Sequence, residues 1–267
     1  MVTFKYSSVL LVQVFLLAFP YRAIAQIKSE PTETKRVVSE ILSEMVLVEG
    51  GIFKMGCTSE QGDECSSDEF PAHEVEVRPF YILSTEFTQD WWITLMGDNP
   101  SSFCRGGKFP VEMVSHADVM HFIDLLNEAS GLRFRLPAEA EWEFAARGGN
   151  KSCGYRFSGS NDPNEISWNS KNAFSKTRYA KTKAPNELGI YDMSGNVWEW
   201  VQEPYYLYRI VASQKNAYPN DFVVRGGSYA GSPSFCRTAI RYHYAGDFKS
   251  SYLGFRLVLD QGQMPSH

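Results

Sequence analysis

The sequence lacks any long block of basic residues. Its 26 Lys and Arg side chains are outnumbered by 31 Asp and Glu side chains, which leaves a formal net charge of −5. Proteins that bind nucleic acid concentrate Lys and Arg in a stretch or on one face, where they meet the phosphates. No such concentration stands out here, and nucleic acid is therefore not an expected partner.

Long apolar runs are also scarce, and the one that exists stands at the N-terminus. Residues 9–19 read VLLVQVFLLAF, follow Lys5 and precede Ala23-Ile24-Ala25. A basic start, a short apolar run and an Ala-x-Ala site are typical of a secretory signal peptide over residues 1–25. The alternative is an uncleaved anchor, although the run is shorter than the ~20 residues of a membrane helix. We expect a secreted or periplasmic protein that begins at Gln26 and has no membrane span.

Cysteine is infrequent, with five in 267 residues, and no two are arranged as Cys-x-x-Cys. The five histidines likewise show no zinc spacing, so no zinc site is expected. Cys57 and Cys65 bracket the polar loop TSEQGDE, and in an exported protein they are the favoured disulfide pair. An odd count leaves at least one free thiol, and the states of Cys104, Cys153 and Cys236 stay open.

Internal repeats and compositional breaks are absent, which favours one domain. Hydrophobic residues make up 43% and aromatic residues 14% of the chain, enough for a sizeable core. We expect a linker with a short amphipathic helix over residues 26–45, the domain over 46–260 and a tail over 261–267.

Local patterns predict several elements within that domain. Residues 45–56 alternate with period two around Gly50-Gly51 and predict a hairpin, and residues 73–88 alternate again, with Val75 and Val77 on one face. One helix is predicted from a Ser115 cap to Gly131, and a second from Pro137 to Gly148 with Trp142 in the core. Beyond Gly149, the density of Gly, Asn, Ser and Asp indicates long loops and short strands.

The stretch YDMSGNVWEW (residues 191–200) raises a question of its own, because two tryptophans flank Glu199. An exposed Trp-Glu-Trp would leave two large apolar rings in contact with water. We therefore expect the rings to be packed and the carboxylate to have a specific partner.

Five ordered motifs resemble the formylglycine-generating enzyme family, also called the sulfatase-modifying-factor family. They are FRLPAEAEWEFAARGG (134–149), NELGIYDMSGNVWEW (186–200), VRGGSY (224–229), CRTAIR (236–241) and GFRLV (254–258). The resemblance implies a compact α+β domain, a C-type-lectin-like variant with little regular secondary structure.

The resemblance also implies a structural calcium ion. Carried over residue by residue, its ligands are the carboxylates of Asp192 and Glu199 and the carbonyls of Gly195 and Val197, a mixture that calcium accepts. The alternative is that Asp192 caps a turn and Glu199 meets an arginine. A second family calcium site is not expected, because residues 167–185 contain no Asp or Glu.

Copper is not expected. Active family members hold copper(I) with two thiols, and the position of the first is occupied here by Gly231, which leaves Cys236 without a partner thiol. The resemblance still points to a substrate groove, for which the candidates are Trp198, Ser228, Tyr229, Cys236 and Arg241. The alternative for Trp198 is a core position, and for Arg241 a buried carboxylate partner.

Three hypotheses for function follow, and they leave open whether the protein is an enzyme. The first is an exported binding or accessory protein whose partner is a protein, a peptide or a small molecule. The second is an oxidative-maturation enzyme similar to the family's periplasmic branch without thiols. The third is a formylglycine-generating oxidase that acts on a sulfatase cysteine, which the loss of the thiol pair disfavours.

Overall fold

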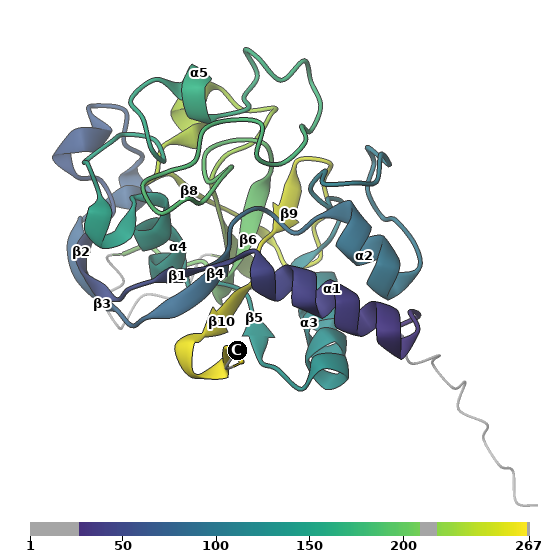
Figure 1. The fold of residues 1–267 in the computed structure, drawn as a ribbon. Coiled ribbons are helices and arrows are strands. Elements are labelled where there is room, and N and C mark those ends of the chain that lie inside the picture. The colour runs from purple at the N-terminus through teal and green to yellow at the C-terminus, as the bar shows by residue number, and fades with distance from the viewer. Residues whose placement is uncertain (1–26, 209–217, 266–267) are drawn as a thin grey trace, which may run out of the picture.

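The fold is described by a computed structural model that covers residues 27–208 and 218–265 (Figure 1). The expected signal peptide therefore lies outside the described residues. No helix in the described part of the chain is both long enough and apolar enough to cross a membrane. The helices in this part are α1 (Pro31–Ser43), α2 (Gln89–Met96), α3 (His116–Ser130), α4 (Glu139–Ala146) and α5 (Pro163–Ile166).

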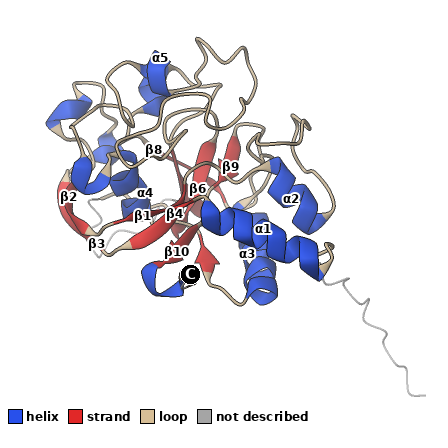
Figure 2. Ribbon diagram, in the orientation of Figure 1, coloured by secondary structure: helices blue, strands red, loops and turns tan. Residues whose placement is uncertain are grey.

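The strands form three sheets (Figure 2). One sheet has the order β1-β4-β10-β5, from Met45–Val48, Phe80–Leu83, Val258–Asp260 and Phe134–Arg135. A second pairs β2 (Gly51–Met55) with β3 (His73–Val77). The third has the order β8-β7-β6-β9, from Arg241–Ala245, Asp221–Arg225, Trp198–Pro204 and Leu253–Phe255, with β6 and β9 parallel.

The predicted hairpin over residues 45–56 is wrong in its pairing, although both strands exist. β1 pairs with β4 and β2 with β3, so residues 45–55 and 73–83 form one antiparallel unit with a break in the middle. A Cβ at Gly50 would lie 2.4 Å from the Val77 carbonyl oxygen and 2.8 Å from Pro79. Gly50 and Gly51 therefore do not form a turn. They allow a close approach to the opposite strand at the point where the chain leaves one sheet and enters the other.

The segment expected to be a linker is part of the folded core. Helix α1 lies beside α2 and α3 (Figure 1), and Val37 and Ile41 belong to the main apolar cluster with 1% and 0% of their surfaces exposed. The sequence predicts the amphipathic helix, but it contains no local sign of the surface on which the apolar face packs. The domain thus begins at α1 and not at Val46.

The two longer predicted helices are confirmed. The Ser115 hydroxyl accepts a hydrogen bond from the Asp118 N–H at 3.1 Å and caps α3, which ends at Gly131 in the left-handed conformation. Helix α4 begins at Glu139, two residues later than predicted, because Ala138 is extended ahead of it and the Glu141 carboxylate accepts from the Ala138 N–H. Trp142 is fully buried, as expected.

The loop-rich region is also present. Between α4 and β6 the described chain has only short helical segments, and these loops gather at one end of the molecule above the strands (Figure 1). Strand β6 lies at the centre of the core: Trp198 and Trp200 belong to one apolar cluster, and Val201 belongs to the other. The candidate site is built around this strand.

Candidate functional site

The residues of the Trp-Glu-Trp sequence are all packed, as their composition suggested. Trp200 is fully buried and its indole N–H donates to the Val114 carbonyl at 3.0 Å. The Glu199 carboxylate accepts from the Trp142 indole N–H at 2.8 Å and from Nε and Nη2 of the Arg256 guanidinium at 2.6 and 2.7 Å. Glu199 therefore meets an arginine, which is the alternative that the sequence left open.

Three carboxylates lie in the same buried region around that one guanidinium. Glu86, Asp192 and Glu199 are 0%, 3% and 0% exposed, and all three act on one another and on Arg256 electrostatically. One Asp192 oxygen accepts from the Lys181 N–H at 2.9 Å. Fully ionised, the cluster of Glu86, Asp192, Glu199 and Arg256 would carry two net negative charges away from water.

Glu86 is the member of this cluster that the sequence analysis missed. Neither of its carboxylate oxygens has a hydrogen-bond partner among the described residues. Burial, followed by repulsion from Asp192 and Glu199, raises its pKa well above the usual value. Burial likewise raises the pKa of Asp192 to about 6. The available signal was a lone acid in the apolar stretch FYILSTEF, directly before the buried Phe87.

This donor set fits a hard divalent cation in charge and in chemistry. Calcium binds oxygen ligands, and its charge of +2 would offset the two net negative charges of the ionised cluster. The expected ligands lie together in the chain: Asp192, Gly195 and Val197 form the buried loop that leads into β6. They differ from expectation in two respects. Glu199 already shares both oxygens with Arg256, while Glu86 has both oxygens unpartnered. The carboxylate oxygens of Glu86, Asp192 and Glu199 are also not all within 4.8 Å of one another.

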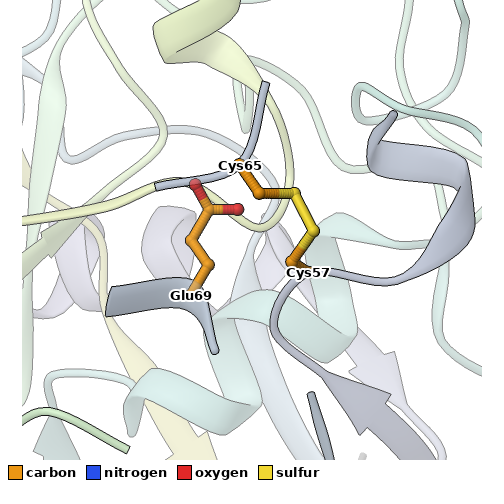
Figure 3. Close-up of side chains that lie close together, drawn as sticks. All are labelled: Cys57, Cys65 and Glu69. Carbon is orange, nitrogen blue, oxygen red and sulfur yellow. A yellow bond between two sulfur atoms is a disulfide. The ribbon is translucent and has the colours of Figure 1, made fainter. Parts of the chain in front are cut away.

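A different trio, shown in Figure 3, is not a metal site. Cys57, Cys65 and Glu69 are the one group of at least three Cys, His, Asp or Glu side chains in residues 27–208 and 218–265 whose ligand atoms lie mutually within 4.8 Å. Cys57 and Cys65 form a disulfide, which confirms the predicted pair, and both Glu69 oxygens accept from Arg237 at 2.6 and 2.8 Å. All the ligand atoms are therefore already in use.

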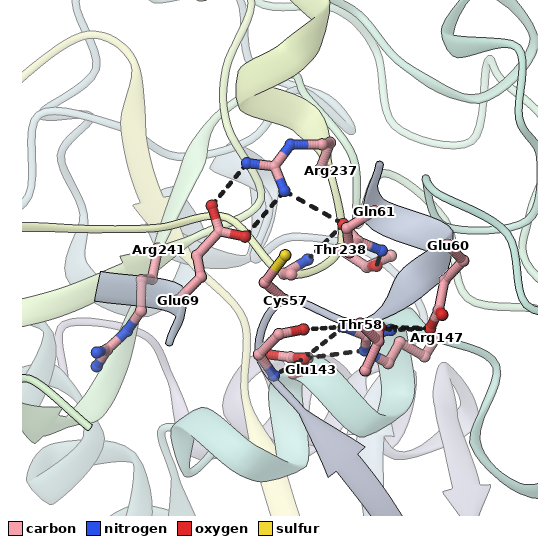
Figure 4. A network of polar contacts seen from close by, with 12 residues as sticks. Cys57, Thr58, Glu60, Gln61, Glu69, Glu143, Arg147, Arg237, Thr238 and Arg241 are labelled. Atoms are coloured by element: carbon pink, nitrogen blue, oxygen red, sulfur yellow. Dashed lines mark hydrogen bonds and ion pairs between the residues drawn. The ribbon is translucent and has the colours of Figure 1, made fainter. Parts of the chain in front are cut away.

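Figure 4 shows the polar network that surrounds the disulfide loop. Arg147 donates to Glu143, Glu60 and Thr58, while Arg237 holds Glu69. Several of these groups are almost completely buried, so their ion pairs fix the loop to α4 and to the chain just after Cys236.

Arg241 belongs to the interior and does not line a groove. Its guanidinium makes a two-point pair with Glu139 at 2.7 and 2.8 Å and lies over the rings of Tyr205 and Tyr208. This is the buried carboxylate partnership that the sequence left as the alternative. A guanidinium held on every side in this way cannot turn towards a ligand without breaking a buried pair.

An aromatic pocket does exist next to β6, with a volume of about 260 Å³. Its lining consists of small residues and aromatic rings, namely Trp198, Ser228, Ala230, Gly231, Phe235, Tyr242, Tyr244 and Tyr252. Two of the five groove candidates, Trp198 and Ser228, are therefore at the pocket. The four aromatic residues that accompany Trp198 were not predicted, because they come from η4 (Pro233–Cys236), from β8 and from the turn before β9.

Tyr229 and Cys236 lie behind the lining. The Tyr229 hydroxyl is 2.8 Å from the Ser251 hydroxyl, and the residue is 6% exposed. Cys236 is fully buried with Phe157 and Ile166, and burial raises the pKa of its thiol to about 12. Cys104 and Cys153 are free and exposed. The lining of the described pocket thus includes no thiol, and Gly231 is one of its residues.

Comparison with known proteins identifies the family. The Sulfatase-modifying factor enzyme 1-like domain matches residues 30–261. The chain is 33% identical over 236 residues to the chaperone protein LppX of Paenibacillus barcinonensis, covering 68% of this chain and 79% of that protein. It is 29% identical over 196 residues to the formylglycine-generating enzyme of Mus musculus, covering 64% of this chain and only 51% of the enzyme.

Solved structures agree with this match. Treponema denticola variable protein 1 superposes with a TM-score of 0.70 and 28% identity over 81% of this chain and 94% of that one. PvdO from Pseudomonas aeruginosa superposes with a TM-score of 0.69 and 24% identity, over 81% of this chain and 94% of that one. At this identity the match supports the fold alone. The chain therefore belongs to the sulfatase-modifying factor enzyme 1-like family and has the family's α+β fold.

Proposed function

We propose that this protein is an exported binding or accessory member of its family, and that the aromatic pocket receives an apolar or aromatic group of its ligand. The observation that carries the proposal is the lining: five aromatic rings surround Gly231 and Ser228, with no thiol at the pocket surface. Such a lining supplies apolar contact area and ring stacking. The name of the Paenibacillus relative, a chaperone protein, is consistent with an accessory role.

The same proposal includes one structural calcium ion. Asp192, the carbonyls of Gly195 and Val197, and Glu199 would hold it, with Glu86 as a further acid. The ion would neutralise the buried excess charge and rigidify the loop that leads into Trp198 at the pocket. Two observations support it, namely the two unpartnered oxygens of Glu86 and the surplus of carboxylates over cations in the cluster. The calcium is structural in this proposal and takes no part in chemistry.

A fluorine NMR experiment tests the pocket. Trp198 lines it, so protein labelled with 5-fluorotryptophan should show one resonance, assigned with W198F, that shifts when N-acetylphenylalaninamide is added. N-acetylalaninamide is the matched control and should leave it unchanged, because it has no ring to stack. Tyr242→Ala should weaken the shift. An unchanged Trp198 resonance with the aromatic probe would reject the pocket as a binding site.

An activity test separates the proposal from the two enzymatic alternatives. A peptide that contains Cys-x-Pro-x-Arg should remain unoxidised in air with copper(I) present, since a soft ion gains little from one sulfur. Turnover of that peptide, seen as a change in the mass of its cysteine, would make the protein a formylglycine-generating oxidase. Oxygen uptake without peptide turnover, during a screen of small phenols, would instead favour the oxidative-maturation alternative.

A further inference from the structure

The segment between α5 and β6 has an unusual charge. Residues 167–185 contain five basic side chains, Lys171, Lys176, Arg178, Lys181 and Lys183, and no Asp or Glu. The whole chain has a formal charge of −5, so the remaining residues sum to −10. We call residues 167–185 the basic segment. A cationic stretch on an otherwise acidic protein attracts anionic groups locally while the rest of the surface repels them.

Three of these cations have no ion-pair partner in the part of the chain that the structure describes. Lys181 pairs with Glu44, and the Lys183 ammonium donates to the Asn164 carbonyl. In the described part of the chain, by contrast, no carboxylate lies within 4.0 Å of a charged nitrogen of Lys171, Lys176 or Arg178. Their charge is therefore available to a partner.

The basic segment also presents an aromatic side chain to solvent. Phe174 is 79% exposed, and both Phe174 and Ser175 have positive φ angles, of 52° and 54°. A bulky residue in this backbone region costs about 1–3 kcal/mol, and such strain is concentrated at binding sites. The Arg178 guanidinium lies over the Phe174 and Trp168 rings, at 5.3 and 5.1 Å from their centres. Rings and cations thus occur together on this surface.

Direct hydrogen bonds attach the basic segment to the aromatic pocket. The Ser170 N–H donates to the carbonyl of Gly231, a pocket residue, at 2.9 Å. Asn196 exchanges hydrogen bonds with the Arg178 backbone at 2.8 and 3.2 Å, and its own carbonyl accepts from the Tyr229 N–H at 2.8 Å. The backbone that carries the cations is therefore bonded to the chain that lines the pocket.

We infer that the pocket and the basic segment together bind an acidic segment of a partner protein, which inserts one apolar or aromatic side chain into the pocket and places its carboxylates against Lys171, Lys176 and Arg178. This inference rests on the proposed function, since it names the chemistry of the partner that the pocket would receive. A pocket of about 260 Å³ has room for a side chain of that kind. Peptide recognition that combines an apolar anchor with rim charges gains affinity from the first and specificity from the second.

The chemistry of the pocket distinguishes this partner from other polyanions. Nucleic acid and sulfated polysaccharide carry charge along their whole length, and the excess of −10 on the rest of the chain opposes such a contact. A short acidic segment can be confined to the positive area. A sulfated sugar also has no apolar side chain to insert among the five aromatic rings.

The test is selection from a randomised peptide library displayed on phage, followed by affinity measurements with the most enriched peptide. Four forms of the full mature protein are compared. They are wild type, K171E/K176E, the matched control K35E/K54E and Y242A. Lys35 and Lys54 are exposed, lie on α1 and β2, and give the same change in net charge away from the pocket. Competition with heparin is measured in parallel.

Peptides selected on the wild type should be rich in Asp and Glu and contain an aromatic residue. Their affinity should fall about tenfold in K171E/K176E, more than in K35E/K54E, and should weaken with salt because exposed charges are screened. Y242A should also bind weakly. Peptides without an acidic excess, equal loss in the two charge-reversed variants, failure to select any peptide, or complete displacement by heparin would each overturn the inference. The uncharged probe at Trp198 would still shift in those cases if the proposed function holds.

Discussion

At Glu199 the burial of the side chain could be predicted from the sequence, but its hydrogen-bond partners could not. Flanking tryptophans indicate that the residue is buried, and a buried carboxylate needs donors. The donors are Trp142 and Arg256, which are 57 residues away in either direction along the chain. Sequence spacing contains no information about such contacts, which is why the sequence did not indicate the acid Glu86 in the same buried cluster.

The carboxylate cluster gives the first prediction. A calcium chelator should lower the melting temperature of the wild type, since a ligand at a hundredfold its Kd stabilises the folded state by about 2.7 kcal/mol. Glu86→Gln should reduce this difference and should also raise the stability of the calcium-free protein, because it removes a buried ionisable acid that has no partner. Asp247→Asn, at an exposed site, is the control and should leave both values unchanged. Identical melting of the wild type with and without chelator would contradict the site.

His116 gives a second prediction, which concerns pH. Its ring stacks on Phe222 at 3.7 Å between centres, and burial lowers its pKa from 6.5 to about 4. Because the folded pKa is depressed, the neutral form is the one the fold favours. Its contribution, about 3 kcal/mol, is therefore complete above pH 6.5 and is lost as the pH falls through about 4.

Urea denaturation between pH 7 and pH 4 measures this effect. His116→Phe keeps an aromatic ring against Phe222 and should flatten the pH dependence of the free energy of unfolding by about 2–3 kcal/mol over that range. His121→Phe, at an exposed position on the same helix, should keep the wild-type slope. Equal slopes in all three proteins would show that His116 titrates normally.

At the scale of the elements, local signals proved more reliable than pairings. Helix α3 could be placed from its Ser115 cap, its apolar spacing and Gly131, because all three are local. The strands over residues 45–55 were also recognisable, but alternation alone does not identify the strand that pairs with them. The aromatic lining of the pocket was missed for the same reason, since it is assembled from separate strands and turns.

Helix α1 gives the prediction at this scale. Ile41 is fully buried in the main core, so Ile41→Ala should lower the free energy of unfolding by about 2–5 kcal/mol. Lys35→Ala changes an exposed residue of the same helix and should have an effect below about 0.5 kcal/mol. A similarly small effect at Ile41, measured by urea denaturation, would mean that α1 is an independent appendage.

For the molecule as a whole, the ordered motifs were the decisive evidence. They predicted the family and the fold over nearly the entire mature chain, and the match over residues 30–261 confirms both. The specific activity did not follow from them, since the residues that distinguish a binding protein from an oxidase are few. In the proposal made above they are Gly231 at the pocket and the buried Cys236.

Export is the prediction at this scale. When the full chain is expressed with its N-terminal segment, the recovered protein should begin at Gln26, and mass spectrometry of the intact protein should also show the Cys57–Cys65 bond. Ala25→Leu should block processing, because the peptidase requires a small residue there. Recovery of the wild type with residues 1–25 still attached would favour the anchor alternative.

Strand β10 has a consequence for the timing of folding. It lies between β4 and β5 in its sheet, so the strand contributed by residues 258–260 completes a pairing begun by residues 80–83. During synthesis that sheet lacks an inner strand until almost the last residue of the domain has been added. A nascent chain of this design stays incompletely folded throughout translation, and its contacts of long sequence separation make the final closure slow.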